Sequence, residues 1–285
     1  MPYRVDVSHA PATAADTLIE LGALDVEFED GGVAALMPDT VSADAVGAAL
    51  GRSRIRVSTA VGRDDQSVWT LRLRPVRVRS WHIVPADDPP GPDTIRLEDT
   101  PAFGTGLHAT TALGLEAIDD LLGLHSGAST AEADLKVGLY ASSPASPPPD
   151  RILDVGTGSG ILALASLRHG VSGAVGLDLD RDALRAAIAN ARLNAAADRM
   201  SLVQGGPDAV RGCWPLVVAN IRAADLMDMA PSLVRRVASG GRLVLSGIPD
   251  AVAADVELTY RRLGMKQVSV SSRDGWSALV LCPSW

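Results

Sequence analysis

The sequence predicts an α/β protein, in which a parallel sheet covered by helices on both faces follows a small α+β domain. Two observations carry this prediction. From residue 151 onward, short apolar runs alternate with helical segments, which is the pattern of a parallel sheet. Before residue 60, the elements follow the order β-α-β-β-α-β, with a hairpin signal, Asp-Gly-Gly, at residues 30–32. This order is typical of a ferredoxin-like domain.

The second half of the chain contains the runs that we expect to be strands: 151–155, 172–178, 200–203, 215–219, 242–246, 267–271 and 277–281. Helices are expected at 161–169, 181–194, 223–238 and 251–263. Only residues 272–276 separate the last two strands, which is too short for a crossover. These two strands should therefore pair antiparallel as a hairpin.

In the first half, strands are expected around Val5 and Val7 and at 26–28, 33–37 and 55–59, with helices at 10–21 and 42–50. We expect the chain to divide into a first domain at 1–80, an interdomain linker at 81–100 and an α/β domain at 101–285. Residues 125–150 interrupt the α/β domain with a stretch rich in Ala, Ser, Pro and Gly that contains three successive prolines. Proline is excluded from helix interiors and central strands, so this stretch is predicted to be a linker-like insertion.

The composition is typical of a globular protein of the cytoplasm. With 47% hydrophobic and 21% charged residues, wholesale disorder is excluded. No apolar run approaches the roughly 20 residues that span a bilayer, and the first residues lack the pattern of a signal peptide. Cys213 and Cys282 are too few for a disulfide framework or a metal site, so a reducing compartment and no metal are expected. The net charge of -8 argues against a general nucleic-acid binder.

A glycine-rich turn, Asp154-Val-Gly156-Thr-Gly158-Ser-Gly160, lies between a predicted strand and a predicted helix. Glycines allow a sharp turn and the close approach of a ligand, and the start of a helix favours an anionic group. A dinucleotide-binding fingerprint would have glycine at position 161, where this chain has Ile161. The G-x-G-x-G spacing after Asp154 favours S-adenosylmethionine over NAD, and a glycine turn without a ligand is the alternative.

Two acidic residues follow the next predicted strand. Asp178 ends this strand, 22 residues after Gly156, where a carboxylate can accept two hydrogen bonds from a ribose diol. Asp180 precedes the helix that begins near residue 181 and is expected to be its N-cap. Asp178 is therefore the candidate ligand and Asp180 a structural residue.

Asn220 closes the apolar run PLVVAN at the end of another predicted strand. Polar residues at the carboxyl ends of parallel strands line the ligand crevice of this architecture. An asparagine carbonyl can accept a hydrogen bond from an amine and orient its lone pair, which makes Asn220 the candidate catalytic residue; a plain turn residue is the alternative. The next residues, Ile221 and Arg222, lack the Pro-Pro-aromatic motif expected of enzymes that methylate nucleobase amines.

A second glycine-containing loop, Phe103-Gly-Thr105-Gly106-Leu-His108, precedes a predicted helix. Thr110 or Thr111 is expected to cap this helix. By itself the loop fits either a simple helix start or a ligand lid, and His108 alone would be a loop histidine.

Taken in order, the motifs resemble those of a known family. The chain resembles the PrmA family of bacterial ribosomal-protein methyltransferases in PAFGTGLHATTALGLEAID, RILDVGTGSGILALA, VGLDLD, VVANI and SGGRLVLSGI. The resemblance covers most of residues 97–281 and depends above all on the unusual FGTGxHxTT loop. It implies a seven-stranded, Rossmann-like class I methyltransferase sheet that binds S-adenosylmethionine. It also implies methyl transfer to lysine side chains and the α-amine of protein eleven of the large ribosomal subunit.

The resemblance also assigns residues of this chain to the cofactor. It implies cofactor contacts at Thr111, Gly156, Asp178 and Asn220, with Asp154, Gly158 and Gly160 in the same turn. It places Thr105, Gly106 and His108 in a loop that closes over the cofactor. The first domain would select the substrate, a basic ribosomal protein. Two alternatives remain: a methyltransferase for another protein or a small amine, and an NAD-dependent oxidoreductase or non-catalytic binding module.

Charge is unevenly distributed along the chain. The first hundred residues hold 10 Arg and 16 acidic residues, a net charge of -6, which would suit a basic protein substrate. Within them, Arg72 and Arg74 are spaced by two, as are Arg77 and Arg79. Each pair is expected to lie on one face of an extended segment, either as a contact surface for an acidic partner or ribosomal RNA or as a solvated strand face.

Overall fold

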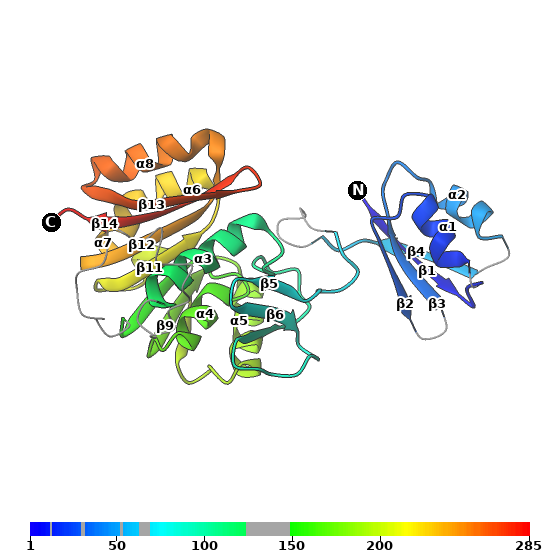
Figure 1. Cartoon of the computed structure of the whole chain (residues 1–285), viewed down its shortest axis with the longest axis horizontal. Coiled ribbons are helices and arrows are strands. Elements are labelled where there is room, and N and C mark those ends of the chain that lie inside the picture. The colour runs from blue at the N-terminus through cyan, green and yellow to red at the C-terminus, as the bar shows by residue number, and fades with distance from the viewer. Residues whose placement is uncertain (12, 30–31, 52–53, 63–68, 124–148) are drawn as a thin grey trace, which may run out of the picture. The chain divides into compact units, whose positions relative to one another are not determined.

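The computed structural model describes residues 1–11, 13–29, 32–51, 54–62, 69–123 and 149–285 of the chain. Almost all of the predicted insertion at 125–150, and the hairpin tip at 30–31, lie outside the described residues. The chain forms two compact units, which Figure 1 shows. The first unit comprises Met1–Arg74 and Asp99–Phe103, and the second comprises Pro75–Glu98 and Gly104–Trp285.

The second unit contains the predicted seven-stranded sheet, in the order β10-β9-β8-β11-β12-β14-β13. Its strands are β8 (Arg151–Val155), β9 (Gly173–Asp178), β10 (Met200–Gln204), β11 (Trp214–Asn220), β12 (Val237–Pro249), β13 (Met265–Arg273) and β14 (Trp276–Pro283). The first five of the order pair parallel, whereas β14 pairs antiparallel with both β12 and β13. The prediction of an α/β sheet that ends in an antiparallel hairpin is confirmed.

Helices cover both faces of this sheet. They are α3 (Ala109–Gly123), α4 (Ile161–Arg168), α5 (Arg181–Leu193), α6 (Ala223–Asp228), α7 (Ala230–Arg236) and α8 (Ala253–Arg262). Leu153 and Val155 of β8 face a core that includes side chains of α6, α7 and α8. Because side chains alternate along a strand, Asp154 points to the opposite face, where α4 donates a hydrogen bond to it. Figure 1 shows α8 on one side of β13 and β14 and α3 on the other.

The helix expected at 223–238 is two helices, α6 and α7. Pro231 lies in the first turn of α7, and a proline there has no N–H to continue the hydrogen-bonding pattern of a preceding helix. The strand expected at 242–246 is also longer than predicted, because β12 begins at Val237 and runs through the Gly240-Gly241 pair. Neither difference changes the order of the strands in the sheet.

Residues expected to form an interdomain linker, 81–100, contain two strands of the second unit. β6 (Trp81–Pro85) and β7 (Thr94–Leu97) form a three-stranded sheet with β5 (Val76–Val78). Helix α5 and its C-cap hold β7 in place, since Asn194 accepts from the Arg96 N–H at 3.0 Å and donates to its carbonyl at 2.7 Å. The expectation of a linker therefore fails over these residues. β6 pairs with β5 and β7, and Asn194 forms hydrogen bonds with the backbone of β7, so the segment is part of the second unit.

The first unit is a four-stranded antiparallel sheet with two helices. Its strands are β1 (Tyr3–Ser8), β2 (Asp25–Glu29), β3 (Gly32–Met37) and β4 (Arg54–Thr59), in the order β2-β3-β1-β4, and its helices are α1 (Ala14–Glu20) and α2 (Ala43–Ala49). Val5, Val7 and Met37 point to one face, where they pack with Leu18 of α1 and Val46 of α2. This face forms the core of the unit.

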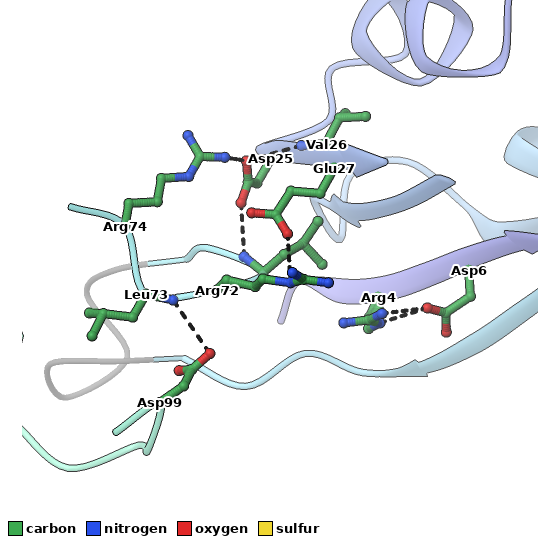
Figure 2. Close-up of polar contacts among 10 residues, drawn as sticks. Arg4, Asp6, Asp25, Val26, Glu27, Arg72, Leu73, Arg74 and Asp99 are labelled. Atoms are coloured by element: carbon green, nitrogen blue, oxygen red, sulfur yellow. Dashed lines mark hydrogen bonds and ion pairs between the residues drawn. The ribbon is translucent and has the colours of Figure 1, made fainter. Parts of the chain in front are cut away.

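The opposite face of this sheet is partly covered by the chain's own residues 69–74. Trp69 and Leu71 pack on Ala34 and Leu36 of β3. The buried Asp25 holds the segment, because its carboxylate accepts from the Leu71 N–H at 2.8 Å and pairs with Arg74 (Figure 2).

The arginines between residues 72 and 79 do not form the expected pairs on extended faces. Arg72 pairs with Glu27 at 3.1 Å and Arg74 with Asp25, both from a segment without regular secondary structure (Figure 2). Arg79 lies in a turn with φ 49° and pairs with Asp120 of α3. Three of the four guanidinium groups are therefore neutralised within the chain, which disfavours the predicted contact surface for an acidic partner or RNA.

The described part of the chain contains no helix long and apolar enough to cross a bilayer. Both cysteines are free thiols, with Cys213 exposed and Cys282 partly buried.

Replacing Asp25 with alanine should release residues 69–74 from the first unit. The change removes the acceptor of a buried N–H and the partner of Arg74, and a hydrogen bond to a charged group contributes about 1.5–3 kcal/mol. Backbone hydrogen exchange at Leu71, measured by mass spectrometry, should accelerate roughly tenfold or more. Asp39→Ala removes an exposed ion pair with the N-terminus and should leave this exchange unchanged. Equal exchange in both variants would contradict the role of Asp25.

Candidate functional site

The predicted site residues gather at the carboxyl ends of three adjacent strands. β8 pairs in parallel with β9 on one side and with β11 on the other. Asp178 is the last residue of β9 and Asn220 the last of β11, while the glycine turn follows β8 directly. The topology therefore brings Asp154, Asp178 and Asn220 to one edge of the sheet, as predicted from the order of the motifs.

The glycine turn adopts a backbone that other residues disfavour. Gly156, Gly158 and Gly160 have φ values of 70°, 53° and 83°, all in the left-handed region. A Cβ atom at Gly156 would also lie 2.2 Å from Cγ2 of Ile221. Glycine is thus needed at position 156 for both its conformation and its close packing against the residue after Asn220.

Most peptide N–H groups of this turn are bonded to acceptors of the protein itself. The Gly156 and Thr157 N–H groups both donate to the Leu177 carbonyl at 2.8 Å. The Gly158 N–H donates to Oδ2 of Asp178 at 2.9 Å, and the Gly160 N–H to the Thr157 carbonyl at 2.7 Å. These donors stabilise the turn and are not free for an anionic ligand, so the predicted anion site at this point is weakened.

Asp154 is almost fully buried beneath the turn. Its Oδ2 accepts from the Thr157 hydroxyl at 2.8 Å and from the Ala163 N–H at 3.3 Å, whereas its Oδ1 is buried without a partner among the described residues. Burial raises the pKa of Asp154 to about 7, and the Thr157 hydrogen bond opposes this rise. The carboxyl ties the turn to the first turn of α4.

Asp178 and Asp180 have the separate roles that their positions predict. Asp178 is half-buried; besides the Gly158 N–H, it accepts from the Asp180 N–H at 3.0 Å. Each of its oxygens retains a second lone pair with which a diol could bond. Asp180 is the N-cap of α5, because its side chain accepts from the Asp182 N–H at 2.8 Å. The N-cap prediction is confirmed.

Asn220 is buried and bonded to a residue 109 positions earlier in the chain. Its Nδ2 donates to the Thr111 hydroxyl of α3 at 3.3 Å, while its Oδ1 is buried without a partner in the described residues. Ser246 of β12 lies opposite Asn220 in the parallel register, and its buried Oγ likewise has no partner there. The edge of the sheet thus holds unpartnered polar atoms on β8, β11 and β12, which is typical of a ligand site.

The loop before α3 is bonded to the glycine turn. The Ser159 hydroxyl donates to the Gly104 carbonyl at 2.7 Å. Thr105 is buried and its hydroxyl accepts from the Leu107 N–H at 3.3 Å. Gly106, with φ 84°, packs against Ile83 of β6. The loop is therefore held next to the predicted cofactor turn, consistent with its assignment to the same site.

His108 caps helix α3 in place of the expected threonines. The helix begins at Ala109, and Nδ1 of His108 accepts from the Thr110 N–H at 3.3 Å and bonds its hydroxyl at 2.8 Å. The His108 ring packs edge-on against Trp276 at 5.0 Å. The expectation that Thr110 or Thr111 is the N-cap is wrong, because both lie inside the first turn.

The sequence did not point to three residues that support the site. Asn190 of α5 donates to the Ser159 carbonyl at 2.8 Å and accepts from the Glu98 N–H at 2.8 Å, so it joins the turn to the end of β7. The signal was present, since two asparagines four residues apart interrupt the apolar face of an Ala-rich helix. Ser159 and Ser246 carry no such signal. Among the described residues, no cluster of three or more His, Cys, Asp or Glu side chains could hold a metal ion.

Replacing Asp154 with asparagine should remove a pH dependence of folding stability. Between the ordinary carboxyl pKa of 3.8 and the raised value of about 7, the folded chain holds a proton that the unfolded chain has lost. The free energy of unfolding of the original protein should therefore fall across this window by up to about 4 kcal/mol relative to the variant. Urea denaturation at pH 4, 5.5, 7 and 8 measures the difference, and parallel profiles would contradict the raised pKa.

A comparison with protein families identifies relatives over most of the chain. The family model described as ribosomal protein L11 methyltransferase (PrmA) matches residues 39–282. A ribosomal protein L11 methyltransferase of Geobacter sulfurreducens is 38% identical over 217 residues, covering 74% of this chain and 64% of that protein. One of Pelobacter propionicus is 38% identical over 197 residues, covering 67% of this chain and 58% of that protein.

A solved structure has the same fold. The crystal structure of a ribosomal protein L11 methylase from Lactobacillus delbrueckii subsp. bulgaricus matches with a TM-score of 0.60 and 27% identity, covering 74% of this chain and 99% of that chain. In the two sequence comparisons, by contrast, this chain spans only about 60% of the length of the relatives from Geobacter sulfurreducens and Pelobacter propionicus. The glycine turn, Asp178, Asn220 and the loop before α3 all lie within residues 39–282. The chain belongs to the ribosomal protein L11 methyltransferase (PrmA) family.

Proposed function

We propose that this protein is an S-adenosylmethionine-dependent N-methyltransferase that methylates amines of ribosomal protein L11. Family membership supports the reaction class, and the substrate after which the relatives are named supports ribosomal protein L11 as the acceptor. Lysine side chains and the α-amine are the proposed acceptors. The absence of a Pro-Pro-aromatic motif after Asn220 supports a protein amine rather than a nucleobase, because no stacking residue follows it.

One observation carries the choice of cofactor. The peptide N–H groups of Gly156, Thr157, Gly158 and Gly160 are bonded to protein acceptors, so the turn has little capacity left for a pyrophosphate. A dinucleotide would need such donors at the turn and the helix start. S-adenosylmethionine carries no phosphate, and its ribose diol would suit the remaining lone pairs of Asp178. The turn therefore favours S-adenosylmethionine over NAD.

The polar atoms at the sheet edge fit the other parts of such a cofactor. The Oδ1 atoms of Asp154 and Asn220, which have no partner among the residues that the structure describes, are acceptors. They would suit the ammonium group of the cofactor and the acceptor amine, respectively. The close packing of Gly156 on Ile221 keeps the turn near Asn220. We propose that Asp178 and residues 156–160 hold the cofactor, with Thr105, Gly106 and His108 beside it.

When bound, S-adenosylmethionine would supply a methyl group on a sulfonium: the C–S bond would break, its electron pair would stay on sulfur, the neutral amine nitrogen would form the new C–N bond, and the resulting ammonium would release its proton to solvent. The amine must be neutral, whereas a free lysine has a pKa near 10.4. Burial near Asn220 and the positive charge of the neighbouring sulfonium would both lower the pKa of the acceptor amine. The Asn220 carbonyl can accept one N–H of the neutral amine and direct its lone pair, so the residue contributes positioning rather than proton abstraction.

We propose that the first unit selects the protein substrate. Its order of elements and its strand order β2-β3-β1-β4 support a ferredoxin-like fold. The net charge of -6 over the first hundred residues would suit a basic ribosomal protein. Asp6, Asp25 and Glu27 already pair with arginines, so the acids that remain exposed are the better candidates. A cytoplasmic location would follow from this substrate.

The proposed function is tested by incubating the enzyme with recombinant ribosomal protein L11 and S-adenosylmethionine. Intact-mass spectrometry should detect additions of one or more methyl groups, and fragmentation should assign them to amines. A small-amine methyltransferase would instead leave the protein unmodified and methylate free lysine in a parallel reaction. Methylation of neither acceptor, with the cofactor bound, would contradict the proposal.

Replacing Asp178 with alanine should weaken S-adenosylmethionine binding. The variant loses the acceptor for the ribose and the acceptor that orders the Gly158 N–H. The dissociation constant from isothermal titration should rise tenfold or more. Asp180→Ala is the matched control two residues away, because it removes only the N-cap of α5 and should leave the dissociation constant unchanged. Similar affinities in both variants would remove Asp178 from the cofactor site.

A further inference from the structure

A five-residue segment of the chain belongs to the first unit although the second unit flanks it on both sides. Residues 99–103 group with the first unit, whereas the residues next to them, Glu98 and Gly104, belong to the second. The first unit holds this segment through Asp99, whose carboxylate accepts from the Leu73 N–H at 3.4 Å (Figure 2). The two ends of the segment are therefore covalent links between the unit proposed to select the protein substrate and the unit proposed to hold the cofactor.

The end of the segment at Gly104 is bonded directly to the glycine turn. The Ser159 hydroxyl donates to the Gly104 carbonyl at 2.7 Å. Gly104 has a φ of 97°, and a Cβ atom at this position would lie 2.8 Å from Oγ of Ser159. Glycine is thus required at position 104 for both its conformation and its close approach to the turn.

The other end of the segment, at Glu98, is bonded to the same turn residue through Asn190 of α5. Asn190 is fully buried, and its Nδ2 donates to the Ser159 carbonyl at 2.8 Å. Its Oδ1 accepts from the Glu98 N–H, also at 2.8 Å. The amide thus uses its donor and its acceptor on the backbone of two different elements, which fixes its orientation. Both ends of the segment are therefore held by Ser159, one directly and one through Asn190.

We propose that Asn190 is a positioning residue, which together with Ser159 ties both ends of residues 99–103 to the cofactor turn and makes the affinity for the protein substrate depend on bound cofactor. A ligand that orders the turn restricts both ends of the segment through these hydrogen bonds. The segment has then lost conformational entropy before the protein substrate binds, so the protein binds more tightly. The inference rests on the proposed function, which assigns the turn to the cofactor and the first unit to the protein.

The test measures the dissociation constant of recombinant ribosomal protein L11 for the full chain, with and without saturating S-adenosylhomocysteine. This product analogue occupies the site without methyl transfer. In the original protein, S-adenosylhomocysteine should tighten the binding of the ribosomal protein about threefold or more. By linkage, the ribosomal protein should tighten the binding of S-adenosylhomocysteine by the same factor. Asn190→Leu, which removes both side-chain hydrogen bonds at similar volume, should bring this factor close to one.

Two further variants separate positioning from general damage to α5. Ser159→Ala removes the hydrogen bond to Gly104 but keeps the carbonyl that Asn190 bonds, so it should lower the factor in part. It also provides the test if Asn190→Leu does not fold, as judged by circular dichroism and thermal melting. Asn194→Leu is the matched control one helical turn later, because Asn194 bonds the backbone of Arg96 in β7. This variant should keep the factor of the original protein.

A second readout does not depend on the protein substrate. Hydrogen exchange of residues 98–104, followed by mass spectrometry, should slow about threefold or more when S-adenosylhomocysteine binds the original protein. In Asn190→Leu, saturating S-adenosylhomocysteine should leave this exchange almost unchanged. A residue that only stabilises the fold would alter exchange equally with and without the ligand.

Three results would overturn the inference. The first is equal binding of the ribosomal protein with and without S-adenosylhomocysteine in the original chain. The second is an unchanged factor in both Asn190→Leu and Ser159→Ala, and the third is an equal loss of the factor in Asn194→Leu. If the ribosomal protein does not bind at all, the proposed substrate fails. Slower exchange with S-adenosylhomocysteine in the original chain but not in Asn190→Leu would then still support the link between the turn and residues 99–103.

Discussion

The site depends on the turn between β8 and α4, where the backbone enters the left-handed region at Gly156, Gly158 and Gly160. Such a turn exposes peptide groups that must find partners. Here the Leu177 carbonyl and the Asp178 carboxylate at the end of β9 accept three of its N–H groups. The turn is therefore stabilised by the neighbouring strand, and its shape depends on the parallel pairing of β8 with β9.

Other parts of the second unit are bonded to the same turn. The Ser159 hydroxyl holds the loop before α3 through the Gly104 carbonyl. Asn190 of α5 connects the Ser159 carbonyl with the Glu98 N–H at the end of β7. Gly156 packs directly on Ile221, next to Asn220. A single change in the turn would therefore disturb the loop before α3, the sheet of β5, β6 and β7, and Asn220 together.

The sequence predicted well whatever depends on local pattern. The apolar runs located all seven strands of the large sheet, and the five residues at 272–276 predicted its terminal hairpin. Asp180 was correctly separated from Asp178, because an N-cap is a local interaction between neighbouring residues. Because the carboxyl ends of parallel strands meet at one edge of a sheet, the sequence also predicted that Asp154, Asp178 and Asn220 lie together, although their motifs are far apart in the chain.

What the sequence did not predict depends on pairing between distant residues. Nothing local indicates that Thr111 bonds Asn220 across 109 positions, or that Asn194 holds β7 in a region expected to be a linker. The arginines at 72 and 74 were expected to be solvated or bound to a partner, yet acids of β2 neutralise them. These pairings arise only once the sheets are assembled.

We propose that the turn binds a cofactor that has a ribose and an amino acid part but no phosphate. Thermal unfolding of the full chain with S-adenosylhomocysteine or with NAD tests it most directly. A ligand at a hundred times its dissociation constant stabilises the folded state by about 2.7 kcal/mol. The melting temperature should rise by several degrees with S-adenosylhomocysteine and stay constant with NAD. A melting temperature that rises only with NAD, or that rises with neither of the two ligands, would contradict this proposal.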